Sequence, residues 1–385
     1  MVNKKDPKKY ILPHSEAKLE FYESYLKRYL RIILLSEHIT TISIFDLFCG
    51  TGIYEDGKSG SPILAFNIIQ NILAEYPKYK NTKTINLIVN DGESKNIEKV
   101  KSKLDTLNTS KVCNIYYKSY GSDEIFKRVN NYLKKNNDSR ARNLIFIDPY
   151  GYKEIHKNDI EKLLSNGHTE IILFLPLSHM HRFKGVAFSD KINPSYTKLR
   201  NFIIEFFPND HPLIKGQFTD IYKFINYLKD AFSFNNKFFT ASFYIQRDKA
   251  NFNVLFFISP NIYGMEKILE VKWQLDRNTG RGYSIGQDDL NLQQLLPGFQ
   301  LNQFEKNLEN YLKGNTNTSN LDLYLFTIKN EHLPKHTNEI LKKWQNEKTL
   351  LVLDVEKNKD ARKNSFYINF DYYKNNKIKV SFKKI

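Results

Sequence analysis

A buried strand that ends in a glycine turn is the feature that most constrains this chain. From position 43 the sequence reads Ser-Ile-Phe-Asp-Leu-Phe-Cys-Gly-Thr-Gly, an apolar run typical of a central strand. Gly50 and Gly52 permit a sharp turn and leave room for a ligand against bare main chain. The dinucleotide spacing G-x-G-x-x-G fails because position 55 is Glu55, and the phosphate-loop spacing also fails. The alternatives are therefore a different ligand site or an ordinary strand-to-helix turn.

Strands alternate with helices in the residues that follow. The predicted helices cover residues 14–35, 63–73, 123–134 and 157–164, and a further Lys-rich helix runs from the residues after Glu93 to Leu107. The first predicted strand lies in 42–52 and ends in the glycine turn, and the others cover 84–90, 112–117, 143–147 and 170–175. Residues 190–232 are predicted to be a helical insertion, and a hairpin over 238–246 and 253–259 adds two further strands. This alternation predicts an α/β domain over residues 1–295, with a mostly parallel Rossmann-like sheet that binds ligands at the carboxyl ends of its strands.

The pattern changes near residue 301. Three short helices over 304–312, 321–329 and 334–345 precede strands over 350–355, 366–371 and 378–382, which predicts a winged-helix-like domain over residues 301–385. Residues 321–385 hold 14 Lys and Arg against 8 Asp and Glu, a formal charge of +6. The third helix is expected to expose four residues to nucleic acid: Lys335, His336, Asn338 and Lys342. A domain whose helix packs only against a protein partner would have the same pattern.

The whole chain carries a formal charge of +16, which favours a polyanionic partner such as DNA or RNA. A Lys- and Asn-rich proteome encoded by an AT-rich genome would produce the same charge. Cys49 and Cys113 are the only cysteines, too few for a disulfide framework, so we expect a reducing cytoplasm. Neither a signal peptide nor an apolar run of about 20 residues is present in the sequence, so no membrane contact is expected.

The motif Asp46-x-Phe48-x-Gly50-x-Gly52 is similar to the first motif of S-adenosylmethionine-dependent methyltransferases. The resemblance implies that this segment borders the methionine end of the cofactor. Asp91 ends the second strand and is the candidate for the ribose hydroxyls, with Glu93 as its rival. Asp123 and Ser122 are candidates for the adenine amino group, although a helix N-cap explains Asp123 equally well.

An acid, a proline and an aromatic residue follow the fourth strand as Asp148, Pro149 and Tyr150. They resemble the Asp/Asn-Pro-Pro-Tyr site of amino methyltransferases, in which the acid holds the target amino group and the aromatic ring stacks on the flipped base. This chain has one proline, and Tyr150 comes one position early. The resemblance implies catalytic roles for these three residues, and the departure leaves base-amino methylation open. A tight strand-ending turn is the structural alternative.

The chain as a whole resembles the three-Cys-motif partner proteins, a family abbreviated TcmP. The likeness is carried by residues 14–18, 46–52, 54–57, 60–62, 146–151, 255–258, 272–273 and 333–341. Gly60-Ser-Pro and Asp148-Pro-Tyr-Gly are its most specific segments. The resemblance implies a class I methyltransferase-like fold in bacterial and mobile-element settings, with a radical-SAM-like partner that carries the three cysteines.

These observations lead to two functions of different classes. The first is a methyltransferase that uses S-adenosylmethionine and acts on nucleic acid. The second is a non-catalytic partner that binds the cofactor or nucleic acid and works with the three-Cys-motif protein. The glycine turn with Asp91 favours cofactor binding in either case, and the irregular site at Asp148 favours the second function.

Overall fold

The chain forms two compact units in the computed structural model, which describes residues 12–187, 196–215, 220–246, 251–284, 299–315 and 317–385. Unit 1 comprises Met1–Lys267 with Gly282–Ile285, and unit 2 comprises Ile268–Arg281 with Gly286–Ile385. The division falls within helix α9 (Ile262–Leu275). The boundary that the sequence placed near residue 295 lies outside the described residues.

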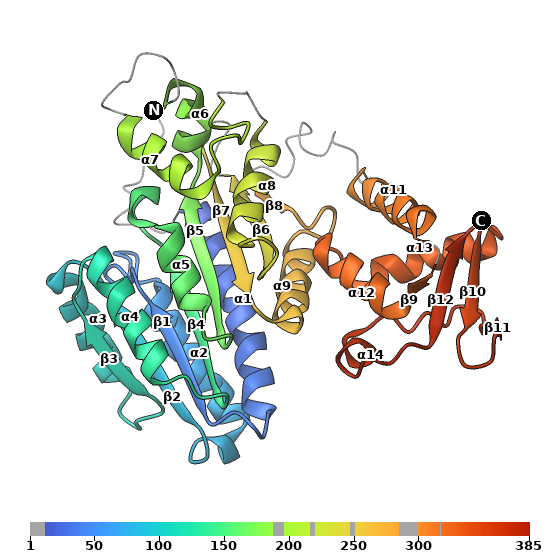
Figure 1. Cartoon of the computed structure of the whole chain (residues 1–385). Helices are drawn as coiled ribbons and strands as arrows, with labels where there is room; N and C mark the ends of the chain where they lie inside the picture. Colours follow the sequence, from blue (N-terminus) through green and yellow to red (C-terminus); the bar gives the residue numbers. More distant parts are fainter. Residues whose placement is uncertain (1–11, 188–195, 216–219, 247–250, 285–298, 316) are drawn as a thin grey trace. The chain divides into compact units, whose positions relative to one another are not determined.

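An eight-stranded sheet forms the centre of unit 1, in the spatial order β3-β2-β1-β4-β5-β7-β6-β8 (Figure 1). Its strands are β1 (Thr41–Asp46), β2 (Thr84–Asn90), β3 (Asn114–Lys118), β4 (Ala141–Ile147), β5 (Thr169–Pro176), β6 (Phe239–Gln246), β7 (Phe252–Ser259) and β8 (Gly282–Ser284). Strands β1 to β5 are parallel, whereas β7 is antiparallel to both β5 and β6. This strand order confirms the predicted mostly parallel, Rossmann-like sheet. Because the order reverses between β1 and β4, a crevice is expected at their carboxyl ends.

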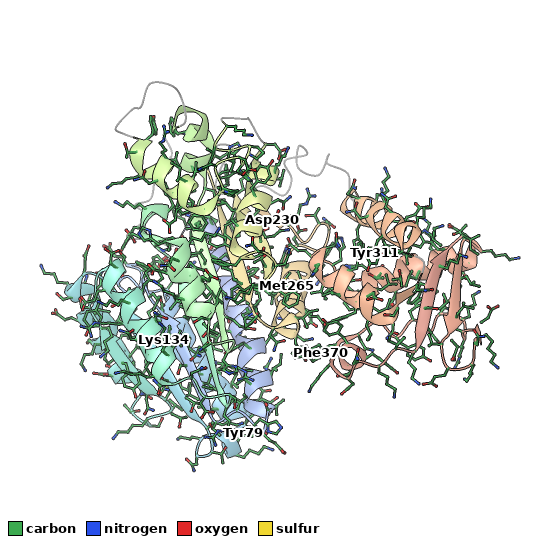
Figure 2. The ribbon with its side chains drawn as sticks, viewed as in Figure 1. Tyr79, Lys134, Asp230, Met265, Tyr311 and Phe370 are labelled. Carbon is green, nitrogen blue, oxygen red and sulfur yellow. The ribbon has the colours of Figure 1, made fainter. Side chains whose placement is uncertain are left out.

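Helices cover both faces of this sheet. They are α1 (Pro13–Leu35), α2 (Ser61–Glu75), α3 (Ser94–Leu107), α4 (Ser122–Lys135), α5 (Lys157–Leu164), α6 (Ser178–Ala187), α7 (Thr197–Phe206), α8 (Ile221–Phe232) and α9. Side chains of β4 alternate between the faces: Phe146 stacks on Tyr22 of α1, and Ile145 packs in the core formed with α4 and α5. The outer side of α4 carries exposed charged residues such as Lys134 (Figure 2).

The helices α6, α7 and α8 share the hydrophobic core of unit 1. Phe206 packs on Phe232, and Phe232 packs on Phe256 of β7, with ring centroids 5.2 Å and 5.1 Å apart. The predicted insertion over 190–232 falls largely on α7 and α8, whereas residues 190–195 and 216–219 lie outside the described part of the chain. Among the described helices, none combines the length and apolar character needed to cross a membrane.

Unit 2 has a winged-helix arrangement, as the sequence predicts. Its elements after α9 are α11 (Phe299–Gly314), β9 (Thr318–Ser319), α12 (Asn320–Lys329), α13 (Pro334–Asn346), β10 (Leu350–Asp354), β11 (Lys359–Asp360), α14 (Phe370–Lys374) and β12 (Val380–Lys384). The sheet order is β11-β10-β12-β9, all antiparallel. Ser319 begins α12 through a reciprocal capping box with Asp322, which explains the sharp start of this helix.

The strand predicted over 366–371 is wrong. Asn369 instead caps the short helix α14, because its side chain accepts a hydrogen bond from Tyr372 N at 3.2 Å. Tyr367 has a φ of 55°, a left-handed conformation that interrupts any strand. An apolar alternation at this position therefore serves packing of a loop and not of a sheet.

Candidate functional site

A cavity of about 310 Å³ lies at the carboxyl ends of β1 and β4, between these strand ends and the start of α1. Six of the predicted site residues line it: Phe48, Gly50, Gly52, Asp148, Pro149 and Tyr150. The cavity thus combines two segments that are almost 100 positions apart in the sequence. Its volume is at the small end of the range of ligand sites, roughly 300–1,000 Å³.

The two glycines of the turn have different structural tasks. Both have left-handed backbones, with φ of 57° at Gly50 and 72° at Gly52. A Cβ atom on Gly50 would meet nothing within 4 Å, whereas one on Gly52 would lie 2.7 Å from Val100 Cγ2 of α3. Gly50 therefore presents bare main chain to open space, and Gly52 allows α3 to pack closely against the turn.

Asp91 fixes the glycine turn through hydrogen bonds. It is buried, and its carboxylate accepts hydrogen bonds from Gly50 N at 3.0 Å, Glu93 N at 2.9 Å and Asn96 Nδ2 at 2.9 Å. Three of its hydrogen-bonding positions are thus occupied within the protein. Glu93, in contrast, is exposed and lines the cavity. This geometry favours Glu93 over Asp91 as a carboxylate that meets a ligand.

Asn90 was not singled out from the sequence, yet it ties three strand ends together. Its Nδ2 donates to Leu47 O and Tyr120 O at 3.0 Å and 3.1 Å, and its Oδ1 accepts from Tyr120 N at 2.9 Å. A polar residue at the last position of an apolar strand was the available signal. These hydrogen bonds fix the ends of β1 and β2 and the segment after β3 relative to one another.

Asp46 is fully buried at the end of β1, and neither of its carboxyl oxygens accepts a hydrogen bond of ordinary geometry in the described part of the chain. Burial raises the pKa of Asp46 to about 7. The nearby Ser61 hydroxyl lowers this pKa, whereas the charge of Asp148 raises it further. The Tyr22 hydroxyl is also buried without a partner there. Burial raises the pKa of Tyr22 well above its ordinary value, and the charge of Asp46 adds to this effect.

Lys18 of α1 forms an ion pair with Asp148, which directly follows β4. Lys18 is buried, and its ammonium also lies 4.7 Å from the centre of the Phe174 ring. Burial alone lowers the pKa of Lys18, but the Asp148 carboxylate outweighs this and raises the pKa above its ordinary value. A lysine beside the apolar positions of α1 was the sequence signal for such an anionic partner.

Tyr150 follows this ion pair and is 71% exposed, although it lines the cavity. Asp123 lies in the exposed first turn of α4 and does not line the cavity. Burial raises the pKa of the Cys49 thiol well above its ordinary value, which disfavours a thiolate nucleophile there. Among the described residues, no group of His, Cys, Asp and Glu is arranged to hold a metal ion.

In unit 2, the prediction that His336 is exposed is wrong. Its ring is buried against Trp273, with ring centroids 4.2 Å apart, and its Nδ1 accepts from Leu333 N at 3.2 Å. Burial lowers the pKa of His336 to about 3, so the ring is neutral at pH 7. Lys335 and Lys342 are exposed on α13, whereas Asn338 is half-buried and lines a groove with Lys342 and Tyr367.

Comparisons with known proteins identify one domain. Residues 286–356 match the family model described as a GMT-like wHTH domain, which confirms the predicted winged helix. A search of curated proteins finds no match to the chain.

Several solved structures are similar to part of this chain at low identity. The O-methyltransferase TomG of Streptomyces achromogenes, in complex with SAM, is 11% identical over 64% of this chain and 87% of its own, with a TM-score of 0.31. A DUF574 family protein of Streptomyces avermitilis is 7% identical over 64% and 83%, with a TM-score of 0.32. PKMT2 of Rickettsia typhi, in complex with AdoHcy, is 11% identical over 64% and 56%, with a TM-score of 0.26. Similarity this low identifies neither ligand nor reaction, so the fold assignment rests on the strand order.

Proposed function

We propose that unit 1 binds S-adenosylmethionine and transfers its methyl group to nucleic acid. The observation that carries the proposal is the cavity in which the open main chain at Gly50 and the Asp148-Pro-Tyr segment lie together. It lies at the carboxyl ends of β1 and β4, where the strand order reverses. Ligands of open α/β sheets bind at this position.

The residues present fit this cofactor. The space beside Gly50, which a side chain would fill, admits a ligand close to the backbone. Glu93 is the exposed carboxylate that would accept hydrogen bonds from ribose hydroxyls, while Asp91 fixes the turn. When bound, the cofactor supplies an electrophilic methyl group on a sulfonium. The predicted adenine contact at Asp123 requires this exposed residue to approach a ligand that extends beyond the cavity.

The acceptor is proposed to enter from the side of Tyr150. This ring is exposed at the mouth of the cavity and would stack on an extruded base, while the Asp148 carboxylate accepts a hydrogen bond from the target amino group. Lys18 orients that carboxylate through the ion pair. The winged-helix unit would add affinity for the polyanion through Lys335 and Lys342 on α13.

One observation favours a second candidate function. The Asp148 carboxylate is already paired with a buried lysine, an arrangement that stabilises a fold without any acceptor. The chain would then be a non-catalytic partner that binds cofactor or nucleic acid and acts with the radical-SAM-like three-Cys-motif protein that the TcmP resemblance implies.

Label transfer and cofactor binding, measured on the same variants, separate the two functions. We expect the wild type to transfer the tritiated methyl group of S-adenosylmethionine to DNA or RNA, and Asp148→Asn to lose transfer while it binds cofactor with near wild-type affinity. Asp105→Asn changes an exposed carboxylate that does not line the cavity, so this matched control should change neither measurement. Cofactor at 100 times its dissociation constant should stabilise the wild type by about 2.7 kcal/mol.

The outcomes distinguish the candidates. Binding without transfer to DNA, RNA or a partner protein would support the non-catalytic function. Absence of both binding and transfer would reject the cofactor site altogether. A fully active Asp148→Asn variant would show that the acceptor site lies elsewhere.

A further inference from the structure

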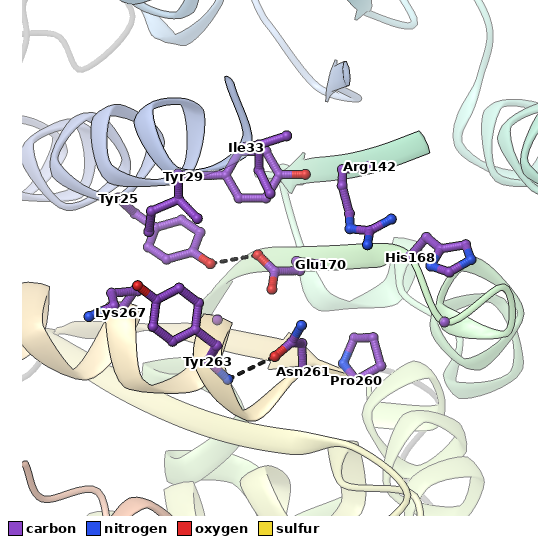
Figure 3. Close-up of a pocket in the computed structure, with 13 residues that line it drawn as sticks. Tyr25, Tyr29, Ile33, Arg142, His168, Glu170, Pro260, Asn261, Tyr263 and Lys267 are labelled. Carbon is purple, nitrogen blue, oxygen red and sulfur yellow. Dashed lines mark hydrogen bonds between the residues drawn. The ribbon is translucent and has the colours of Figure 1, made fainter. Parts of the chain in front are cut away.

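A second cavity lies in unit 1 at the opposite end of the parallel strands (Figure 3). It is bounded by the second half of α1, the first residues of β4 and β5, and the start of α9. Its volume is about 80 Å³, enough for a few water molecules or for one organic molecule smaller than benzene, which needs a cavity of about 150 Å³. Tyr29 of this cavity and Lys18 of the first cavity are both on α1, roughly 16 Å apart along the helix axis. The two cavities are therefore separate sites.

A buried carboxyl group forms one wall of this second cavity. Glu170 is 8% exposed, and it accepts hydrogen bonds from Tyr25 Oη at 2.5 Å and Ser259 Oγ at 2.8 Å. A Cβ atom on Gly264 would lie 2.0 Å from Glu170 Oε1, so only glycine lets α9 approach this group. Burial raises the pKa of Glu170, which weakens its repulsion of a nearby anion. Its oxygens are satisfied, so it orients Tyr25 and leaves ligand contact to its neighbours.

The Tyr29 hydroxyl is the unsatisfied group. Tyr29 is 5% exposed, lines the cavity, and its Oη has no hydrogen-bond partner among the described residues. A buried polar group without a partner costs about 1–3 kcal/mol. The charges of both Glu170 and Arg142 act on its pKa, so the hydroxyl lies within their electrostatic reach. An acceptor placed in the cavity would satisfy it.

The remaining polar groups at the cavity are mostly donors. Arg142, which lines the cavity, is held by hydrogen bonds of 2.7 Å from its Nη1 to Ser139 O and Ala141 O, and within the described residues its Nε and Nη2 donate no hydrogen bond. Asn261 Oδ1 accepts from Tyr263 N at 2.8 Å, which turns the amide nitrogen toward the cavity (Figure 3). His168 and Lys267 also line it, and Lys267 forms an ion pair with Glu266 at 3.2 Å. Arg142 thus provides the cationic group for an anionic ligand.

Apolar surface completes the walls. Ile32, Ile33 and Pro260 line the cavity together with the rings of Tyr25, Tyr29 and Tyr263. A phosphate is strongly hydrated on all sides and does not match such walls. An apolar body with a single charged acceptor group matches both the walls and the donors.

We propose that this second cavity binds a small organic carboxylate, with its carboxylate toward Tyr29 and Arg142 and its apolar body against the isoleucines of α1. This site makes no use of the proposed cofactor cavity. Its success or failure is therefore independent of the methyltransferase proposal.

Titration calorimetry of the full chain with sodium propionate, a carboxylate with a short apolar body, tests the proposal. We expect propionate to bind, and propionamide and inorganic phosphate to bind at least about tenfold more weakly. Tyr29→Phe removes only the hydroxyl and should weaken propionate binding at least about tenfold, because a hydrogen bond to a charged group is lost. The free Tyr29→Phe protein should melt no lower than the wild type, since the deleted hydroxyl has no partner.

Tyr22→Phe is the matched control. Its hydroxyl is also buried without a partner on α1, but Tyr22 does not line this cavity, so propionate should bind this variant as it binds the wild type. Arg142→Gln tests the charge separately and should also weaken propionate binding. The proposal is overturned if propionate does not bind the wild type at millimolar concentration, if Tyr29→Phe or Arg142→Gln binds it equally well, or if propionamide binds as tightly as propionate.

Discussion

The carboxyl group of Asp46 lowers the stability of the protein as the pH rises. Its pKa is about 7 in the folded protein and about 3.9 in an unfolded chain. The folded state therefore binds the proton more tightly, and the resulting stability is present below pH 4 and is lost as the pH rises through 7. The shift corresponds to roughly 4 kcal/mol as an upper bound.

Asp46→Asn should remove this dependence because asparagine resembles the protonated acid and cannot ionise. We expect the variant to be more stable than the wild type at pH 8, with the difference vanishing near pH 4, as measured by urea unfolding at a series of pH values. Asp105→Asn is a control of opposite sign, because a hydrogen bond from Lys101 lowers the pKa of Asp105. A stability difference for Asp46→Asn that is the same at every pH would contradict the prediction.

At the scale of single residues, the sequence located the cavity but could not assign each role. Residues that follow strands in a parallel sheet necessarily meet at one edge, so six of the predicted residues line one cavity. Burial is a tertiary property, however, and sequence pattern alone could not tell that His336 packs on Trp273. For the same reason, the occupation of Asp91 by three donors was not foreseen.

At the scale of elements, the predictions followed the length of the apolar runs. Buried parallel strands are nearly continuous apolar segments, and β1, β2, β4 and β5 were recognisable for this reason. The short strand β8 was missed because it begins with a glycine and not with an apolar residue. Glycine is needed at position 282, which pairs with Tyr244 of β6, because a side chain there would collide with the backbone of Tyr244. The strand predicted over 366–371 was wrong because the side chain of Asn369 caps helix α14, and this cap outweighs the local strand propensity.

The contact between the glycine turn and α3 gives a prediction for two neighbouring glycines. Gly52→Ala should destabilise the protein by about 2–4 kcal/mol, because it combines a left-handed backbone with a Cβ atom 2.7 Å from Val100 Cγ2. Gly50→Ala introduces the backbone strain without the collision, so we expect it to lower the free energy of unfolding by about 1–2 kcal/mol. Chemical denaturation measures both values.

A double variant isolates the collision. Val100→Ala removes the methyl group that Gly52→Ala meets, so the pair should lose less stability than the sum of the single changes. Val100→Ala combined with Gly50→Ala should be additive and serves as the control. Equal losses for the two glycine variants, or additivity in both pairs, would show that α3 is not held by this contact.

At the scale of the whole molecule, a charge of +16 does not by itself say where a polyanion binds. Many of the lysines are already engaged: Lys343 pairs with Glu305 at 2.8 Å, and Lys313 pairs with Glu309 at 2.9 Å. Lys335 and Lys342 are exposed on α13 and make no ion pair within the described part of the chain. These two residues are therefore the better candidates for phosphate contacts.

The salt dependence of duplex DNA binding tests this assignment in the full chain. Each phosphate contact that is removed should flatten the slope of log K against log salt by about 0.9, so Lys335→Gln with Lys342→Gln should flatten it by about 1.8. Lys313→Gln with Lys379→Gln removes the same net charge from lysines that lie outside α13 and pair with Glu309 and Glu356, and this pair should change the slope less. If both pairs flatten the slope equally, net charge and not α13 governs binding. If the first pair leaves the slope unchanged, α13 does not contact the phosphates, since neutralising a contacting lysine must release fewer counterions.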